Sequence, residues 1–166
     1  KRAEVAVITF GGSVQVAVPV SEARDLAPMT FTAHGMTPMG EAITLAMAEL
    51  ESQKKAHKAA GLEYYRPWLF IITDGAPTDR DVFEQIAPVV REAEKQKHLS
   101  VFSVMVGDQA SDTDLAKLSS VRPPVQLKGL SFVELFLWMS ASLSQVSTSQ
   151  PPDEHGVADE TQVALP

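Results

Sequence analysis

The stretch that decides the fold is "WLFIITDGAPTD", residues 68–79. Its apolar residues run without interruption into Thr73, and Asp74-Gly75 then turns the chain. A continuous apolar run is typical of a strand that is covered on both faces, as in a parallel sheet. A carboxylate at the end of such a strand either forms the turn or belongs to a site, because ligands of open α/β sheets bind beyond the carboxyl ends of the strands.

Similar runs and helical spacings surround this stretch. The predicted strands are residues 4–10, 14–18, 68–73, 100–106 and 125–127, and the predicted helices are residues 39–59, 81–97 and 112–119. Residues 14–18 alternate between apolar and polar, which indicates a half-exposed strand hairpinned to the first at a sheet edge. Pro88 should kink or restart its helix. We therefore predict an α/β fold whose sheet is mostly parallel, with one antiparallel edge strand and helices on both faces.

The C-terminal part of the sequence divides into a helix and a tail. Ser131-Phe132-Val133-Glu134 has the form of a capping box that opens a last helix. The apolar stripe of that helix comprises Phe132, Leu135, Phe136, Met139, Leu143 and Val146. We expect one domain over residues 1–149 and an acidic, proline-containing tail over residues 150–166. Because Lys1-Arg2 leads almost directly into a buried strand, we expect the domain to be truncated at its N-terminus.

The composition excludes several classes of protein. The chain has 166 residues with a net charge of -7 and a pI of about 5.0, which argues against binding to nucleic acid. It contains no cysteine, so disulfides and thiolate chemistry are excluded and a reducing cytoplasm is permitted. No apolar run is long enough to span a membrane.

Two oxygen donors are expected to meet at one edge of the sheet. Thr37 is expected to cap the helix whose first residue is Pro38, and helix starts lie at the same edge as strand ends. Thr37 and Asp74 should therefore approach each other, and a hydroxyl with a carboxylate suits Mg²⁺, Mn²⁺ or Ca²⁺. The positive helix end disfavours a cation, so a further carboxylate is needed, for which Asp79 is a candidate.

Four stretches together resemble a von Willebrand factor A domain. They are "AVITFGG", "GMTPMGEAI", "WLFIITDGAPTD" and "VFSVMVG", and the resemblance extends from Glu4 to about Ser149. The segment "VRPPVQLKGLSFVELFLWMSASLSQVS" resembles the bacterial TerY-type branch, which is associated with tellurite resistance. The resemblance implies a Rossmann-like, three-layer sandwich with a metal-ion-dependent adhesion site (MIDAS).

In this family the site usually holds Mg²⁺ and binds a Glu or Asp of a protein partner without catalysing a reaction. Thr37 matches the threonine of the second metal-binding loop and Asp74 the aspartate of the third. Gly35 and Gly40 would allow close approach of the backbone. The branch implies a cytoplasmic, stress-response context with kinase-like or phosphatase-like partners, and it implies neither nucleic acid nor a membrane span.

The Asp-x-Ser-x-Ser loop of the family, with the central strand before it, has no match in this sequence. Loss of a central strand would leave its two neighbours without ladder partners, at about 1–3 kcal/mol for each unsatisfied buried group. We therefore expect the missing segment to lie outside these 166 residues or to be supplied by another chain. Without it, metal affinity should be poor.

Two other functions compete with this interpretation. An aspartate at a strand end is also typical of phosphoryl-transfer enzymes and receiver domains, but these need a lysine beyond a later strand, and none closely follows Val106. A structural interaction module that uses no metal is the second alternative. Each short motif is weak alone, and the order and context of the four stretches favour the metal site.

Overall fold

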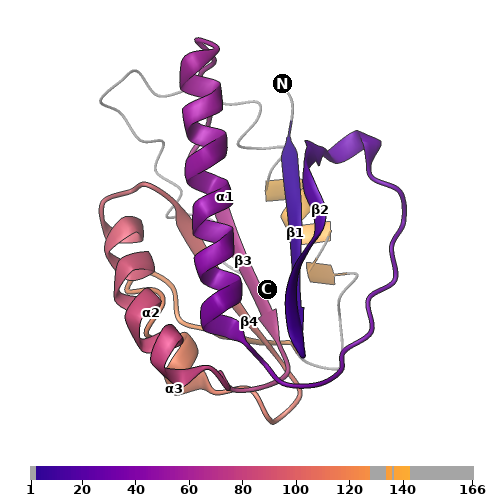
Figure 1. The fold of residues 1–166 in the computed structure, drawn as a ribbon, viewed down its shortest axis with the longest axis vertical. Coiled ribbons are helices and arrows are strands. Elements are labelled where there is room, and N and C mark those ends of the chain that lie inside the picture. Colours follow the sequence, from indigo (N-terminus) through magenta and orange to yellow (C-terminus); the bar gives the residue numbers. More distant parts are fainter. Residues whose placement is uncertain (1–2, 128–133, 136, 143–166) are drawn as a thin grey trace.

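The chain forms an α/β fold in which helices and strands alternate after an initial hairpin (Figure 1). The computed structural model describes residues 3–127, 134–135 and 137–142. The elements are β1 (Glu4–Gly11), β2 (Ser13–Glu22), the 3-10 helix η1 (Ala23–Asp25), α1 (Met39–Ala59), β3 (Trp68–Thr73), α2 (Arg80–Lys95), β4 (Ser100–Val106), α3 (Asp112–Leu115) and β5 (Val125–Leu127). This order confirms the predicted alternation.

β1 and β2 form the antiparallel hairpin that the alternating pattern predicts. Gly12 turns the chain with a φ of 72°, in the left-handed region that favours glycine. Val18 is buried while its neighbours Ala17 and Pro19 are exposed, so β2 is covered on one face only at this point. Pro19 lies within β2, which suits an edge strand because proline cannot donate a ladder hydrogen bond.

β3, β4 and β5 form a parallel sheet in that order. Phe70 lies opposite Phe102 in the first pair, and Met105 lies opposite Gln126 in the second. Parallel pairing requires the chain to cross back after each strand, and the crossings contain α2 and α3. The carboxyl ends of these strands therefore lie at one edge.

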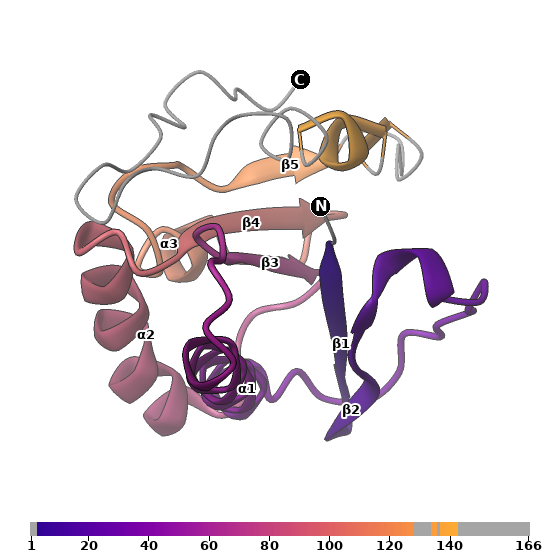
Figure 2. The same cartoon turned by 90° about the horizontal axis from the view of Figure 1, so that it is seen from above.

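The strands fall into two sheets in the described part of the chain, the hairpin and the parallel set. Figures 1 and 2 show the hairpin beside β3, on the side of β3 that is away from β4. No backbone ladder joins β1 to β3 among the described residues. The predicted α/β class is confirmed, but its antiparallel and parallel parts are not one continuous ladder.

The main core lies between the parallel sheet and the pair α1 and α2. Leu69, Ile71 and Val101 point to this side, because alternate residues of a strand face the same way. They pack with residues of the helices, of β4 and of the adjoining loops, namely Met39, Ile43, Phe83, Ala87, Val90, Leu99, Met105, Leu115 and Leu118. Phe10 of β1 packs against the same cluster, so the hairpin shares this core.

The opposite face of the parallel sheet is aromatic. The rings of Phe70 and Phe102 stack with their centroids 4.6 Å apart. Trp138 packs edge-on to both, and Arg122 lies over the Phe102 ring at 4.7 Å. Trp138 belongs to the helical residues 134–135 and 137–142, which lie across the sheet from α1 and α2 (Figure 2). Helices therefore cover both faces, as predicted.

α2 continues through Pro88 as one helix, so the predicted restart at this residue is wrong. The buried residues Phe83, Ala87 and Val90 lie on both sides of Pro88 along the helix. Their packing offsets the hydrogen bond that proline cannot make, and Pro88 itself is exposed.

Some predictions fall outside the described residues. They include the capping box at 131–133, most of the apolar stripe of the last helix and the tail at 150–166. Leu135 of that stripe is described and is buried. Within the part of the chain that the structure describes, no helix is both long enough and apolar enough to cross a membrane.

Candidate functional site

The candidate site lies where β3 ends and α1 begins. The loop before α1 and the loop after β3 are held together by two hydrogen bonds between Thr37 and Thr78, one to a side chain and one between backbone groups. The Thr37 N–H donates to the Thr78 hydroxyl at 3.1 Å, and the Thr78 N–H donates to the Thr37 carbonyl at 2.9 Å. This pairing places the Thr37 loop against the Asp74–Asp79 loop, as the sequence predicted.

The Thr37 hydroxyl lies against Gly75, the residue that follows Asp74. A Cβ atom at Gly75 would lie 2.8 Å from Thr37 Oγ1, which is closer than real Cβ atoms approach. Glycine is therefore required if the hydroxyl is to stay in this position. Among the described residues, neither the Thr37 hydroxyl nor the exposed Asp74 carboxylate has a hydrogen-bond or ion-pair partner.

Asp79 caps α1 from a distant part of the chain. Its two carboxylate oxygens accept from the Gly40 N–H at 3.1 Å and from the Glu41 N–H at 2.7 Å. The Asp79 carbonyl also accepts from the Phe83 N–H at 3.0 Å, in the first turn of α2. Asp79 therefore joins the two helix starts.

The prediction that Thr37 is the N-cap of α1 is wrong. The helix begins at Met39, Pro38 is its N-cap, and no side chain of the flanking residue caps it. The Thr37 carbonyl instead accepts from Met39 N–H and Thr78 N–H. Asp79 is too far from α1 in the sequence to be recognised as its cap from spacing. The one hint in the sequence is that Asp79 directly precedes α2, where a capping residue is expected.

The β1–β2 turn lies beside the Thr37 loop and the Asp74–Asp79 loop. We call these three segments together the rim. The Gly12 N–H donates to the Met36 carbonyl at 2.9 Å. A Cβ atom at Gly35 would lie 2.9 Å from Gly12 N, so Gly35 allows the close approach predicted from the sequence. Met36 is 65% exposed and Phe31 is 54% exposed, so the segment beside Thr37 presents apolar side chains to solvent.

Gly40 allows a second close approach of the backbone, which here joins two helices. A Cβ atom at Gly40 would lie 2.4 Å from the Phe83 backbone nitrogen. Gly40 is buried where α1 meets α2. The start of α1 is therefore fixed against the start of α2 by backbone contact as well as by Asp79.

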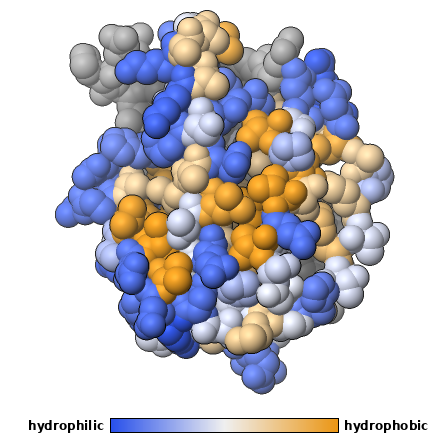
Figure 3. Space-filling model, in the orientation of Figure 1, coloured by the Kyte–Doolittle hydropathy of each residue, from blue (hydrophilic) through white to orange (hydrophobic). Residues whose placement is uncertain are grey.

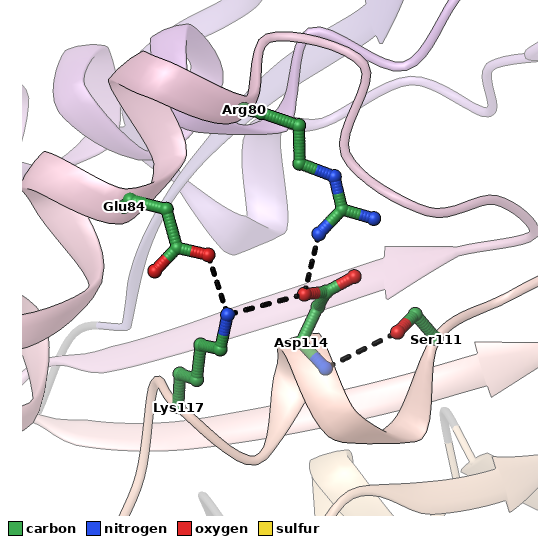
Figure 4. Close-up of polar contacts among 5 residues, drawn as sticks. All are labelled: Arg80, Glu84, Ser111, Asp114 and Lys117. Atoms are coloured by element: carbon green, nitrogen blue, oxygen red, sulfur yellow. Dashed lines mark hydrogen bonds and ion pairs between the residues drawn. The ribbon is translucent and has the colours of Figure 1, made fainter.

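Charged residues near the start of α2 form a cluster that the sequence did not predict (Figure 4). Arg80 Nη1 lies 2.6 Å from Asp114 Oδ1, and Lys117 Nζ lies 2.5 Å from Glu84 Oε1 and 3.5 Å from Asp114 Oδ1. Burial of Asp114 acts to raise its pKa, but its hydrogen bonds with Arg80, Ser111 and Lys117 and the Arg80 charge together outweigh burial and lower it. The cluster ties α2 to α3 and does not contact Asp74.

The residues present provide only part of a metal site. In the described segments, no group of three or more His, Cys, Asp or Glu side chains converges as a metal site would require. Thr37 and Asp74 supply two hard oxygen donors, which suits an ion such as Mg²⁺ that retains several waters. The Asp79 carboxylate also offsets the positive end of α1.

Comparison with known families identifies the fold. The family model for the von Willebrand factor type A domain matches residues 1–128. A comparison with curated proteins found no match. The matched region contains both the Thr37 loop and the Asp74 loop, together with β1 to β5. The chain belongs to the von Willebrand factor type A domain family.

Proposed function

We propose that the chain is a metal-dependent protein-interaction module and not an enzyme. The Thr37 hydroxyl and the Asp74 carboxylate are the metal donors, and a Glu or Asp of a protein partner completes the site. The observation that carries the proposal is the position of Thr37 Oγ1 beside Gly75, with no internal partner for either donor among the described residues.

Mg²⁺ fits this donor set best, with Mn²⁺ or Ca²⁺ as alternatives, because a hydroxyl and a carboxylate are hard ligands. When bound, the ion would attract the partner's carboxylate by direct coordination. Thr37 would bind the ion directly or through water, and Asp74 would bind it or accept a hydrogen bond from its water. Asp79 would not be a ligand, because both of its oxygens accept from α1.

Exposed apolar side chains in the loop before Thr37 support a protein partner. Met36 and Phe31 lie in the loop that leads to Thr37 and would supply contact area around the carboxylate. The TerY-type resemblance supports a cytoplasmic role in bacterial tellurite resistance or a related stress response. Kinase-like or phosphatase-like proteins are the partners that this resemblance suggests.

The metal site is tested with Mn²⁺, whose unpaired electrons broaden nearby NMR signals even when binding is weak. Titration of the 166-residue chain should broaden the amide signals of Gly40 and Gly75 selectively. Asp74→Ala and Thr37→Val should each weaken this effect. Asp108→Ala is the matched control, because Asp108 follows the neighbouring strand β4 and is not a proposed donor.

The outcome also separates the competing functions. Broadening that is equal in the native chain and in Asp74→Ala would contradict the metal site and would favour a module that uses no metal. Incubation with a phosphoryl donor, followed by mass spectrometry, tests the enzyme alternative. A phosphoaspartate at Asp74 would contradict the proposal that the chain is an interaction module.

A further inference from the structure

Two threonines of the stretch "TDGAPTD", residues 73–79, are not donors of the proposed metal site. Thr73 is the last residue of β3, and Thr78 lies between Asp74 and Asp79. Each of these threonines bonds to the backbone of a residue at the site. Their hydroxyls therefore connect the motif to both donors.

The Thr73 hydroxyl closes the turn that carries Asp74. Thr73 is 5% exposed, and its hydroxyl donates to the Gly75 carbonyl at 3.0 Å and accepts from the Gly75 N–H at 3.2 Å. A buried hydroxyl needs such partners, because leaving it unsatisfied is costly. Asp74 lies between the two bonded residues, so the turn fixes its backbone. The direction in which the Asp74 carboxylate leaves the turn therefore depends on Thr73.

Thr78 holds the loop that carries the other donor. Residues 27–36, which precede Thr37, are all exposed, so burial does not fix this part of the loop. The Thr37 N–H donates to Thr78 Oγ1 at 3.1 Å, and the Thr37 carbonyl accepts from the Thr78 N–H at 2.9 Å. Thr78 thus bonds to both polar backbone groups of Thr37, and its hydroxyl makes one of the two bonds.

The two held loops meet at Gly75. A Cβ atom at Gly75 would lie 2.8 Å from Thr37 Oγ1, so the Thr37 hydroxyl rests against the turn that Thr73 closes. A shift of either loop would change the separation of the Thr37 hydroxyl and the Asp74 carboxylate. Hydrophobic residues gather across the middle of the face in Figure 3, and fewer of them lie at its lower end, where α1 begins in Figure 1. Hydrogen bonds suit this end of the molecule better than apolar packing.

We propose that Thr73 and Thr78 are positioning residues of the metal site, which hold the Asp74 carboxylate and the Thr37 hydroxyl in place before an ion binds. This role rests on the proposed function, because the donors are the same. A site with two protein donors is sensitive to their freedom, since ordering a loop on binding lowers the affinity. Residues that hold metal ligands by hydrogen bonds usually change metal affinity by about 10–100-fold when they are replaced.

Paired valine and serine variants test this role. Thr73→Val and Thr78→Val keep the branched shape and remove the hydroxyl, whereas Thr73→Ser and Thr78→Ser keep the hydroxyl and remove the methyl group. Titration of the 166-residue chain with Mn²⁺, followed by broadening of the Gly40 amide signal, gives the apparent affinity. Each valine variant should bind Mn²⁺ roughly tenfold more weakly than the native chain, and each serine variant should bind within about twofold of it.

Thr44→Val is the matched control. The Thr44 hydroxyl donates to the Gly40 carbonyl at 2.8 Å within α1, so this variant also loses a side-chain hydrogen bond near the rim. Its affinity for Mn²⁺ should equal that of the native chain. A loss as large as that of the valine variants at positions 73 and 78 would overturn the proposal, because any missing hydroxyl near the rim would then have the same effect.

Urea unfolding of the same variants separates positioning from general stability. Thr73→Ser removes a buried methyl group, so it should lower the stability while it keeps the affinity for Mn²⁺. An affinity that followed stability across all variants would overturn the proposal, because the hydroxyls would then support only the fold. Thr78 is exposed, so Thr78→Val keeps the comparison possible if the replacement of buried Thr73 prevents folding.

Amide hydrogen exchange of the metal-free chain gives a readout that needs no ion. Thr73→Val should speed exchange of the Gly75 amide and Thr78→Val that of the Thr37 amide, each by roughly tenfold or more, and serine should restore the native rates. Unchanged rates in the valine variants would overturn the proposal, because the loops would then be held without these hydroxyls.

Asp74→Ala distinguishes failure of this role from failure of the metal site. If Asp74→Ala loses the Mn²⁺ effect and the valine variants bind like the native chain, the positioning role is wrong and the proposed function stands. If Asp74→Ala binds like the native chain, the metal site is wrong and the positioning role falls with it.

Discussion

Asp79 is the residue that organises the rim. Its side chain satisfies two backbone donors of α1 and its carbonyl starts α2, so one residue fixes two helix starts relative to each other. The carboxylate also places negative charge at the positive end of α1. Asp74 lies in the same loop, but its carboxylate makes no hydrogen bond or ion pair with the described residues.

Replacement of Asp79 tests this role. Asp79→Ala should lower the free energy of unfolding by about 1–2 kcal/mol, because two amide groups of α1 lose their acceptor. Asp79→Asn should retain part of this stability, since its amide oxygen can still accept one bond. Urea denaturation gives both values. Asp74→Ala is the control and should change stability by about 0.5 kcal/mol or less, as expected for an exposed side chain without partners.

The residues of this rim differ in how far the sequence could predict them. Thr37 and Asp74 could be placed together because a helix start and a strand end share one edge of an α/β sheet. The capping by Asp79 could not, because its partners Gly40 and Glu41 are 39 and 38 positions away and no local pattern links them. Thr37 fitted the preferred residue types for an N-cap, but its loop is instead fixed by Thr78.

At the scale of elements, a buried carboxylate joins α2 to β4 and to the turn before β5. Glu94 is 4% exposed, and it accepts from Val101 N–H at 2.9 Å and from the Ser119 hydroxyl at 2.5 Å. Arg122 Nη1 lies 3.3 Å from the same side chain. The Ser119 hydroxyl oxygen in turn accepts from the Arg122 N–H, so the acid orders the whole turn.

Removal of this carboxylate should be strongly destabilising. Glu94→Ala should lower the free energy of unfolding by about 3 kcal/mol or more, because it leaves Arg122 and buried donors without their acceptor. Glu92→Ala on the same helix is the matched control and should change stability by about 0.5 kcal/mol or less, since Glu92 is exposed. Denaturant unfolding checks both. Similar losses in the two variants would show that helix propensity dominates.

The contact between α2 and α3 should depend on pH. Asp114 has a pKa that is lowered from its ordinary value of 3.8, because the effect of burial is outweighed by Arg80, Ser111 and Lys117 together. Its contribution to stability is therefore complete above pH 3.8 and is lost as pH falls through the lower pKa of the folded state. The difference in unfolding free energy between the native chain and Asp114→Asn should shrink over this acid range. A constant difference would contradict the assignment.

Element types were easier to predict than their pairing. The continuous apolar runs identify β3 and β4 as buried strands. The apolar residues of α1 recur at helical spacing, which identifies it as a helix. The placement of the hairpin beside β3 concerns residues that are about sixty positions apart, and no local pattern of the sequence predicts it. The continuous apolar composition of β3 shows only that it needs cover on more than one side.

At the scale of the whole molecule, the two sheets are held by different forces. The parallel sheet is joined by backbone ladders and covered on both faces by helices. The hairpin is held to the rest by α1, by the packing of Phe10 and by the turn contact at Gly12. A two-stranded hairpin is at best marginally stable alone, so its order depends on these few contacts.

The hairpin should therefore open before the parallel sheet does. In native-state hydrogen exchange of the 166-residue chain, amides of β1 and β2 should exchange at least about tenfold faster than those of β4, which has ladder partners on both sides. Phe10→Ala should widen this difference, because it removes the side chain that joins the hairpin to the main core. Val16→Ala is the control, since Val16 is exposed on the same hairpin. Equal exchange in β1 and β4 would contradict this prediction. It would show that the two sheets unfold together as one cooperative unit, although no backbone ladder joins them among the described residues.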